Sequence, residues 1–463
     1  MYKYYSINKI YKKKNKFINK NIIIKGWVKY FRNNLFLDIN DGTTVKNIQI
    51  VIKKKKFIKI KKKICIGYPL KILGKLIKNK NNKNLFEVIP KNIKLYGKID
   101  KFFINNSILQ NKFHNLSKLR ENEQIYLRFR TNIFNLIMKI RHNLFFIIHK
   151  YFNKKNFIYI NTPIINKNNV EGSCEVFKIT TLDLFKKQLD CNNDLFKCKA
   201  NLTVSGQLEI ESAMYGLGNV YTFGPVFRAE NSNTNKHLSE FWMLEPEIIF
   251  FKLKNIIKFV IKFIKYIFKK ILKKSKNELL LLENYHKKNN KKKNIINRIK
   301  NIINKKFYII SYNKIIKLLN KYKKNIINWG DEIKSIHENI LFNKIIKNNI
   351  PIIIYNFPIK IKPFYMKLNK NIKTTKSFDI IFPFIGEIIG GSERETNYKK
   401  LLKIIKKKKM NIKDIIWYLN LRKLGKIYHS GFGLGFDRLI QYITGMNNIR
   451  DVIPFPIYPK YKF

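Results

Sequence analysis

The chain has 463 residues, long enough for two or three domains with a sizeable core. Its 95 Lys and Arg residues against 29 Asp and Glu residues give a formal net charge of +66, and 45% of its residues are hydrophobic. This composition is typical of a globular protein and permits a polyanionic partner such as RNA. Because lysine, asparagine and isoleucine have AT-rich codons, we assign most of the lysine excess to base composition.

The sequence has no pattern typical of a targeting signal or a membrane span. The N-terminal segment MYKYYSINKIYKKKNKF has lysines but no apolar core, and the most apolar helical stretch, 256–271, is interrupted by lysines. Neither pattern is typical of a secretory signal or a membrane span. The 4 cysteines have no metal-ligand or disulfide spacing. We therefore expect a cytoplasmic protein.

The first hundred residues predict a small β-barrel. Short runs rich in β-branched and aromatic residues alternate with turn signals, and they occupy residues 22–31, 35–40, 45–52, 68–77 and 85–97. Five strands in so short a segment favour an OB-fold over residues 1–100. An aromatic ring can stack on a splayed base, and an amide can bind a base edge. Arg32, Phe36 and Gln49 are the candidates for RNA contacts, with a core position as the alternative for Phe36.

The rest of the chain predicts a larger domain. Residues 101–125 have little periodicity and are interpreted as a linker before a domain over 126–463. A helical pattern over 126–151 is followed by the extended run FIYINTPII, and strands are expected over 201–250. Residues 251–350 form a lysine-rich helical insertion of low complexity. Strands return near 351–355 and 378–391, and a glycine-rich strand leads into a final helix.

The segment FGPVFRAENSNTNKHLSEFWMLEPEIIF, residues 223–250, predicts a strand, a polar loop and a returning strand. Arg228 and Glu230 precede the loop and would share one face of a strand, while His237 and Phe241 follow it. A guanidinium can clamp a phosphate as a fork, and a carboxylate can accept a hydrogen bond from an adenine amino group. The segment therefore suits a bound nucleotide. A charged hairpin with a satisfied ion pair is the alternative.

Three segments carry a resemblance to one family. The pattern F-R-x-E, loop, H-x-x-x-F resembles motif 2 of the class II aminoacyl-tRNA synthetases. Its residues are most similar to those of the asparaginyl branch. HSGFGLGFDRLIQYITG, residues 429–445, resembles motif 3, with alternating glycines that leave one strand face bare and Arg438 opening a helix. FIYINTPII resembles motif 1, which implies a homodimer. No GxxxxGK[ST] phosphate loop is present in the sequence.

This resemblance spans residues 21–459 and implies an α+β fold. An N-terminal OB-fold β-barrel that reads the anticodon would precede a class II catalytic domain, an antiparallel sheet flanked by helices. The implied activity is ATP-dependent activation of asparagine and its transfer to tRNA(Asn), without DNA or membrane partners. An aspartyl-tRNA synthetase and a catalytically inactive, synthetase-like RNA-binding protein remain the alternatives.

The resemblance also assigns roles to residues. In the barrel, Arg32, Phe36 and Gln49 stand at the anticodon-reading positions. The catalytic arginines would be Arg228 and Arg438. The ATP site would comprise Arg228, Glu230, His237, Phe241, Glu387 and Arg438. The amino-acid site would comprise Glu171, Gln207, Glu245 and Arg394.

The residue types fit these roles. A carboxylate and a guanidinium suit the two ends of a side-chain amide. The aspartyl branch has a lysine three residues after the equivalent of Gln207, but here the residue is Ile210, which cannot neutralise a second carboxylate. Asp379 and Glu387 offer hard oxygen ligands beside a triphosphate, which favours a Mg²⁺ site.

Overall fold

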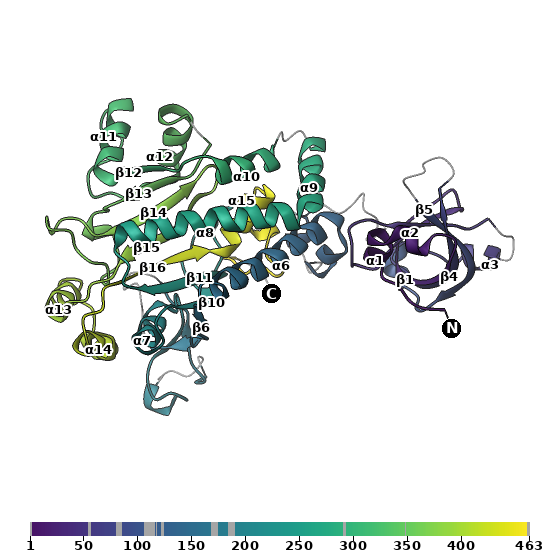
Figure 1. Ribbon diagram of the computed structural model, residues 1–463. Coiled ribbons are helices and arrows are strands. Elements are labelled where there is room, and N and C mark those ends of the chain that lie inside the picture. Colours follow the sequence, from purple (N-terminus) through teal and green to yellow (C-terminus); the bar gives the residue numbers. More distant parts are fainter. Residues whose placement is uncertain are drawn as a thin grey trace. The chain divides into compact units, whose positions relative to one another are not determined.

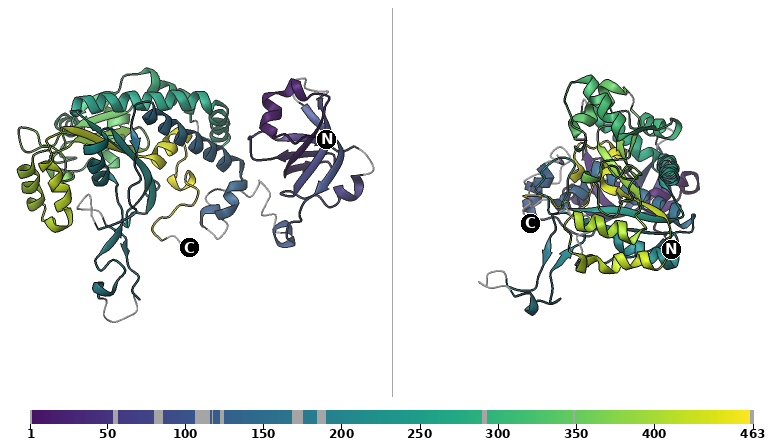
Figure 2. Two further views of the ribbon diagram at one scale, coloured as in Figure 1. Left: turned by 60° about the horizontal axis from the view of Figure 1, so that its bottom comes forward. Right: turned by 90° about the vertical axis from the view of Figure 1, so that its left-hand side faces the viewer.

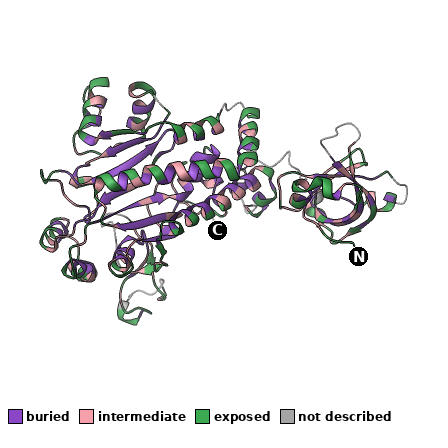
Figure 3. Ribbon diagram, in the orientation of Figure 1, coloured by how far each residue is buried: buried purple, intermediate pink, exposed green. Residues whose placement is uncertain are grey.

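The computed structural model of the chain divides into two compact units, Met1–Leu136 and Ile137–Phe463, each with a buried interior (Figure 3). The structure describes residues 2–53, 57–79, 86–105, 116, 118–121, 125–167, 175–183, 190–289, 293–347 and 349–460.

The first unit contains a closed five-stranded barrel with the strand order β1-β2-β3-β5-β4 (Figure 1). Its strands are β1 (Asn21–Arg32), β2 (Phe36–Asn40), β3 (Ile48–Val51), β4 (Pro69–Lys78) and β5 (Phe86–Leu95). Each coincides with one of the five predicted runs, so the predicted OB-fold is confirmed. Alternate residues of the strands fill the barrel: Leu37, Ile39, Ile48 and Ile50 are fully buried.

Short helices surround the barrel, and the sequence did not reveal them. Before β1 lies α1 (Ile7–Lys12), whose N-cap Ser6 accepts a hydrogen bond from the backbone N–H of Lys9. It is followed by α2 (Lys14–Phe17), and α3 (Ile58–Lys61) lies between β3 and β4. The side chains of Ile7, Ile10 and Phe17 pack into the barrel core. These helices were missed because one short turn carries too little periodicity to be detected.

The predicted linker contains two short helices, α4 (Lys101–Asn105) and α5 (Lys118–Glu121), and the rest of it lies mostly outside the described residues. A 3-10 turn, Ile125–Arg130, leads into the long helix α6 (Asn132–Asn153). Thr131 caps α6, because its hydroxyl accepts a hydrogen bond from the backbone N–H of Phe134 at 3.2 Å. The predicted helix over 126–151 is therefore present, but it begins after this cap.

The second unit is built on an eight-stranded sheet with the order β12-β13-β14-β15-β16-β11-β10-β6. Neighbouring strands are antiparallel from β13 through β10, and only the two edge pairs, β12 with β13 and β10 with β6, are parallel. The predicted antiparallel sheet is thus confirmed. The strands are β6 (Ile158–Tyr159), β10 (Val220–Phe227), β11 (Glu240–Ile249), β12 (Tyr308–Ser311), β13 (Ile352–Tyr355), β14 (Ser377–Phe382), β15 (Gly386–Glu393) and β16 (His429–Gly435).

Helices flank this sheet. The longest in the predicted insertion, α8 (Leu253–Lys274), runs along the sheet in Figure 1, with its apolar residues buried at three- and four-residue steps and its lysines facing outward. None of the helices in the described part of the chain combines the length and hydropathy that a bilayer crossing requires. The others are α9 (Lys276–Lys288), α10 (Ile295–Asn304), α11 (Tyr312–Tyr322), α12 (Ser335–Ile340), α13 (Tyr398–Lys407), α14 (Ile412–Asn420) and α15 (Phe436–Thr444).

Two elements of this unit differ from the predominant structure predicted for their segments. Residues 201–250 are not all strand and loop, because helix α7 (Gln207–Leu217) lies among them. The alternation Leu208-Glu209-Ile210-Glu211 imitates a strand, but the buried residues continue at a helical step to Met214. The insertion is also not purely helical, since β12 forms one sheet edge. A separate small sheet of β7 (Ile165–Asn166), β9 (Ala200–Leu202) and β8 (Lys178–Ile179) projects from the unit in Figure 2.

Candidate active site

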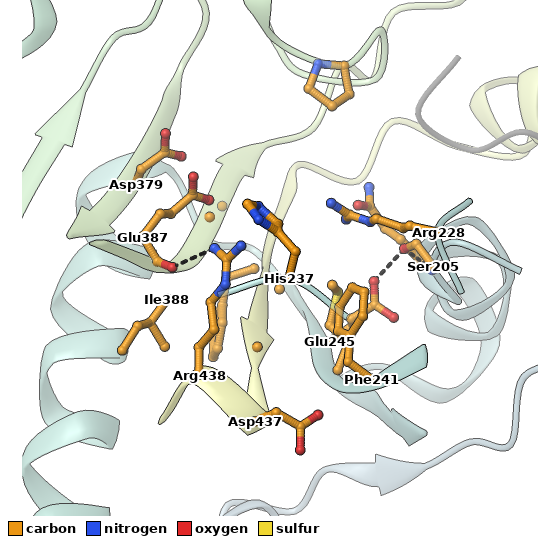
Figure 4. A pocket seen from close by; sticks show the side chains of 18 of the residues that line it. Ser205, Arg228, His237, Phe241, Glu245, Asp379, Glu387, Ile388, Asp437 and Arg438 are labelled. Atoms are coloured by element: carbon orange, nitrogen blue, oxygen red, sulfur yellow. Dashed lines mark hydrogen bonds between the residues drawn. The ribbon is translucent and has the colours of Figure 1, made fainter. Parts of the chain in front are cut away.

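A cavity of about 300 Å³ lies among the β10–β11 loop, strands β14 to β16 and the start of α7 (Figure 4). Glu171 lies outside the described residues, but every other residue predicted for this domain lines the cavity. These residues are Gln207, Arg228, Glu230, His237, Phe241, Glu245, Asp379, Glu387, Arg394 and Arg438. They come from five separate segments of the chain, so the fold gathers the predicted nucleotide, amino-acid and metal ligands in one place.

The β10–β11 hairpin has the predicted strand, loop and returning strand, with Phe227 paired to Glu240. Strand β10 ends at Phe227, so Arg228 and Glu230 lie in the loop, and the expectation that they share a strand face was wrong. The hairpin still anchors Arg228, whose backbone N–H donates to Ser239 O at 2.9 Å. Its guanidinium lies 5.5 Å from the ring centre of Phe241. Arg228 and Phe241 thus form one wall of the cavity.

His237 is held by the loop itself. Its Nδ1 lies 2.6 Å from Thr234 Oγ1 and 3.1 Å from Ser232 Oγ. Burial, followed by the positive charge of Arg438, lowers the pKa of the imidazole below its usual value. Both effects favour the neutral form of the side chain. In Figure 4, His237 and Arg438 extend into the same space.

The glycines of β16 have two different functions. Gly433 and Gly435 line the cavity, as the prediction of a bare strand face requires. Gly431 instead makes room for a protein side chain: a Cβ there would lie 2.0 Å from Glu247 Oε1. Only part of the glycine pattern therefore serves a ligand, and the rest accommodates a buried carboxylate.

Arg438 lies in the first turn of α15, directly after this strand. Its Nη1 donates to the carbonyl oxygen of Glu387 at 2.9 Å, and its Nε donates to that of Lys236 at 3.4 Å (Figure 4). These two bonds aim the guanidinium across the cavity. The neighbouring Asp437 turns away and is buried, where it pairs with Arg141 of α6 and accepts from the backbone N–H of Trp242 at 2.8 Å.

Asp379 and Glu387 approach one another across β14 and β15. A Cβ on Gly390 would lie 3.0 Å from Glu387 Oε1 and 3.4 Å from Asp379 Oδ1, so both carboxylates flank the same bare Cα. Lys362, which the sequence did not point to, donates to both Asp379 oxygens at 2.7 and 2.6 Å. Burial raises the pKa of Asp379 to about 7 against the opposing charge of Lys362, and Glu387 adds to the rise.

The predicted amino-acid ligands lie on the other side of the cavity. Glu245 accepts hydrogen bonds from the hydroxyl of Ser205 and from the backbone N–H of Gly206, the latter at 3.0 Å. Arg394 pairs with Glu247, to which its Nε donates at 3.1 Å, and its Nη1 donates to Ser392 Oγ at 2.7 Å. Burial would lower the pKa of the guanidinium, but Glu247 outweighs burial and raises it. The sequence did not identify Glu247.

Ile210 does not have the position that the sequence analysis expected. Its side chain is fully buried in a small cluster with Met214 and Val220, and it is not among the residues that line the cavity. Position 210 therefore supplies no cation, and it does not line the cavity.

The predicted RNA-contacting residues lie together on the outer surface of the barrel. Arg32 pairs with Phe36 across β1 and β2, and Gln49 of β3 lies opposite Asp38. Phe36 and Gln49 are partly exposed, whereas Leu37 between Phe36 and Asp38 points into the core. The core alternative for Phe36 was therefore wrong. Arg32 Nη2 lies 3.1 Å from Asp38 Oδ2, an acceptor that the sequence did not identify.

Comparisons with known proteins agree with this arrangement. Residues 117–459 match the family of tRNA synthetases class II (D, K and N), and residues 22–96 match the OB-fold nucleic acid binding domain. The asparagine–tRNA ligase of Azobacteroides pseudotrichonymphae is 43% identical over 455 residues, which are 96% of each chain. That of Borreliella burgdorferi is 41% identical and covers 96% of this chain and 97% of its own.

Solved structures extend the comparison. The crystal structure of asparaginyl-tRNA synthetase from Pyrococcus horikoshii, complexed with asparaginyl-adenylate, matches 99% of both chains with a TM-score of 0.84 and 28% identity. An asparaginyl-tRNA synthetase from Entamoeba histolytica matches with a TM-score of 0.79 and 26% identity, over 95% of this chain and 96% of its own. The chain thus belongs to the class II aminoacyl-tRNA synthetases of the aspartyl, lysyl and asparaginyl group, and within that group to the asparagine–tRNA ligases.

Proposed function

We propose that the protein activates asparagine with ATP and transfers it to tRNA(Asn) in the cytoplasm. The observation that carries the proposal is the convergence of Arg228, Arg438, Glu245 and Arg394 on one cavity. Two arginines there suit phosphate groups, and a carboxylate with a guanidinium suits an amide. Membership of the asparagine–tRNA ligases supports the same reaction.

In the first step, an oxygen of the asparagine carboxylate attacks the α-phosphorus of ATP, and the bond to pyrophosphate breaks. The reaction needs no covalent nucleophile from the protein, so the residues act by positioning the reactants and compensating charge. Arg228 would bind the α-phosphate, and Arg438 would bind the departing phosphates. Phe241 would stack on the adenine, Glu230 would accept from its amino group, and the neutral His237 would lie near the γ-phosphate.

Gln207, Glu245 and Arg394 would hold the amino acid. Glu245 is a negative acceptor for the side-chain NH₂ group. A guanidinium has five N–H donors, and the contacts of Arg394 to Glu247 and Ser392 leave donors that can face a side-chain oxygen. Gln207, and by resemblance Glu171, would lie near the α-amino group.

Asp379 and Glu387 would hold Mg²⁺. They fit the ion, because both present carboxylate oxygens around the Cα of Gly390, where no side chain intervenes. When bound, Mg²⁺ would supply positive charge to the phosphates. Lys362 already balances the negative charge of Asp379. The ion pair holds this buried carboxylate in place without a metal ion.

The first step can be tested by exchange of labelled pyrophosphate into ATP. We expect exchange to depend on both asparagine and Mg²⁺ and to stop when EDTA removes the ion. Exchange that proceeds equally well without asparagine would contradict the proposed function, and exchange that survives EDTA would contradict the metal site alone.

The barrel would read the anticodon of tRNA(Asn). Replacing Phe36 or Gln49 by alanine should leave asparagine activation unchanged and weaken tRNA aminoacylation, since stacking of one base contributes about 1–3 kcal/mol. Charging should be compared near physiological ionic strength, where non-specific contacts of the many lysines are screened. Tyr96→Ala, which removes another exposed aromatic ring of this unit, serves as the control. Equal charging by all three variants and the parent would show that this surface does not read tRNA.

We further propose that the second unit forms a homodimer through α6 and its surroundings. Phe146 and Phe455 are 53% and 56% exposed, and Ile158 and Tyr159 of the edge strand β6 are each 44% exposed. A neighbouring groove of about 400 Å³ includes Phe145 and Phe455. So much apolar surface in one region is typical of a surface that another chain covers.

Light scattering should therefore give twice the mass of one chain, and Phe146→Asp should lower the mass toward that of a monomer, because a buried unpaired carboxylate is costly. Leu424→Asp is a matched control, since Leu424 is 75% exposed elsewhere in the same unit. A monomeric parent, or dissociation by both substitutions alike, would contradict the proposed interface.

A further inference from the structure

Glu211 lies directly behind the amino-acid side of the cavity. It is the fifth residue of α7, it is fully buried, and it is not among the residues that line the cavity. Four side chains donate to its carboxylate: Gln207 Nε2 at 3.0 Å, the Tyr418 hydroxyl at 2.8 Å, Arg422 Nη2 at 2.8 Å and His429 Nε2 at 3.1 Å. The donors come from α7, α14, the turn after α14, and β16.

These donors keep the carboxylate charged. Burial alone would raise the pKa of Glu211, but Arg422, His429 and Arg394 outweigh burial and lower it. Tyr418 and Arg422 are themselves bonded, with Arg422 Nη2 donating to the Tyr418 hydroxyl at 2.6 Å. These contacts thus favour the charged form of Glu211 inside the protein, and each bond to it restricts the orientation of its donor.

The first restricted group is the side-chain amide of Gln207. A carboxylate can only accept hydrogen bonds, so the amide must turn its NH₂ group toward Glu211. Its oxygen is then the end directed away from Glu211, and Gln207 lines the cavity. Glu211 therefore determines that Gln207 presents its amide oxygen, a hydrogen-bond acceptor, on the side away from Glu211. Such an acceptor suits an ammonium group.

The second cavity-lining group beside Glu211 is the guanidinium of Arg394. Its Nε lies 3.9 Å from Glu211 Oε1, beyond hydrogen-bond distance, and donates instead to Glu247 at 3.1 Å. The ring of Tyr365 lies beneath it, 5.0 Å from the guanidinium carbon. Arg394 is consequently held by Glu247, and Glu211 places a second buried carboxylate beside the same nitrogen.

Two other interpretations of this cluster are less consistent with the contacts. Glu211, Glu247 and His429 lie close enough to share a metal ion, but Arg394 and Arg422 already compensate both carboxylates. A purely structural ion-pair cluster would explain the burial. It would not explain why Glu211 lies against two residues that line the cavity, Gln207 and Arg394.

We propose that Glu211 is a positioning residue for asparagine: it sets the orientation of the Gln207 amide and places a second negative charge beside the Arg394 guanidinium, without lining the cavity itself. This inference rests on the proposed function, because it assumes that asparagine occupies this side of the cavity. It concerns only the amino acid, since none of the donors to Glu211 is among the residues proposed to bind ATP.

The test is Glu211→Gln, which keeps the size of the side chain but loses its charge and one acceptor oxygen. In pyrophosphate exchange, the KM for asparagine should rise about 10- to 100-fold, the factor expected when a hydrogen bond to a charged group is lost. The KM for ATP should not change. Binding of asparagine, measured by calorimetry, should weaken by the same factor.

A second variant keeps the proposal testable if Glu211→Gln does not fold. Tyr418→Phe removes one donor from Glu211 with no change in shape, and it should raise the KM for asparagine by a smaller factor. Its matched control is Tyr312→Phe, which removes another fully buried hydroxyl, one bonded to Asp331 O in the insertion. This control should lower thermal stability without changing either KM.

The outcomes separate the two claims. If the parent enzyme neither binds asparagine nor shows asparagine-dependent exchange, the proposed function fails and the inference with it. If the parent is active and the Glu211 and Tyr418 variants fold with an unchanged KM for asparagine, only the inference fails. If the KM for asparagine and the KM for ATP rise together and stability falls, Glu211 has only a structural role.

Discussion

Replacing Arg438 or Arg228 by alanine is expected to lower the rate of asparagine-dependent pyrophosphate exchange by about 10²- to 10³-fold, which corresponds to about 3–4 kcal/mol of transition-state stabilisation. Negative charge moves onto the departing pyrophosphate as the bond breaks, and a guanidinium already in place compensates it without reorganisation. Bonds to the carbonyl oxygens of Glu387 and Lys236 hold the Arg438 guanidinium at the cavity. The hairpin anchors the backbone of Arg228, and Phe241 packs against its guanidinium.

A control must separate lost catalysis from lost folding. Arg298 of α10 is a suitable position, because its guanidinium donates to Tyr442 O and stacks on the Tyr442 ring without lining the cavity. Arg298→Ala should lower stability and leave exchange unchanged, and Arg438→Lys should recover only part of the activity, because an ammonium keeps the charge but not the fork. Parental exchange rates in Arg228→Ala and Arg438→Ala would show that ATP binds elsewhere.

Aspartate should be activated at least about a hundredfold less efficiently than asparagine, measured as kcat/KM in exchange. The two amino acids differ only at one end of the side chain. Asparagine can turn its NH₂ toward Glu245 and its oxygen toward Arg394, whereas aspartate must place an oxygen opposite a carboxylate. Glu247 already balances Arg394, so that arginine cannot offset a second carboxylate fully.

Substitution at Glu245 identifies the source of this preference. Glu245→Gln removes the like charge and should narrow the ratio of asparagine to aspartate activation, mainly by improving aspartate. Ile210→Val, a small change in the core cluster, should leave the ratio unchanged, because position 210 does not line the cavity. Equal activation of both amino acids by the parent would refute the specificity while leaving the class of enzyme intact.

Residues that act within a short segment were predictable. Arg228, Glu230, His237 and Phe241 stand within one strand–loop–strand segment, and their charges and rings stand out in a lysine-rich chain. Arg438 could be placed because a glycine-rich strand and the first turn of a helix are local features. Charge type and spacing, together with the resemblance of these segments to motifs 2 and 3 of the class II synthetases, pointed to these residues.

Residues that act through distant partners were not predictable. Lys362 and Asp379 are 17 residues apart, and Glu211 meets Arg422 and His429 across 211 and 218 residues. No local sequence pattern predicts such pairs, because each ion pair forms only when two distant elements pack together. For the same reason α7 was assigned as strand: its alternating apolar and acidic residues become a helix with one face against β10 and β11.

The sequence by itself determined the two parts of the fold and, through the resemblance of its motifs to class II synthetases, predicted most of the residues that line the cavity, because strand alternation, turn residues and charged motifs are encoded in neighbouring residues. Only the tertiary structure decided how those groups are held. It gave Asp379 a lysine partner, placed Ile210 in the core, and put Glu211 behind Gln207 and Arg394. Burial is the physical reason: a charge removed from water must find a partner, and folding decides which partner lies within reach.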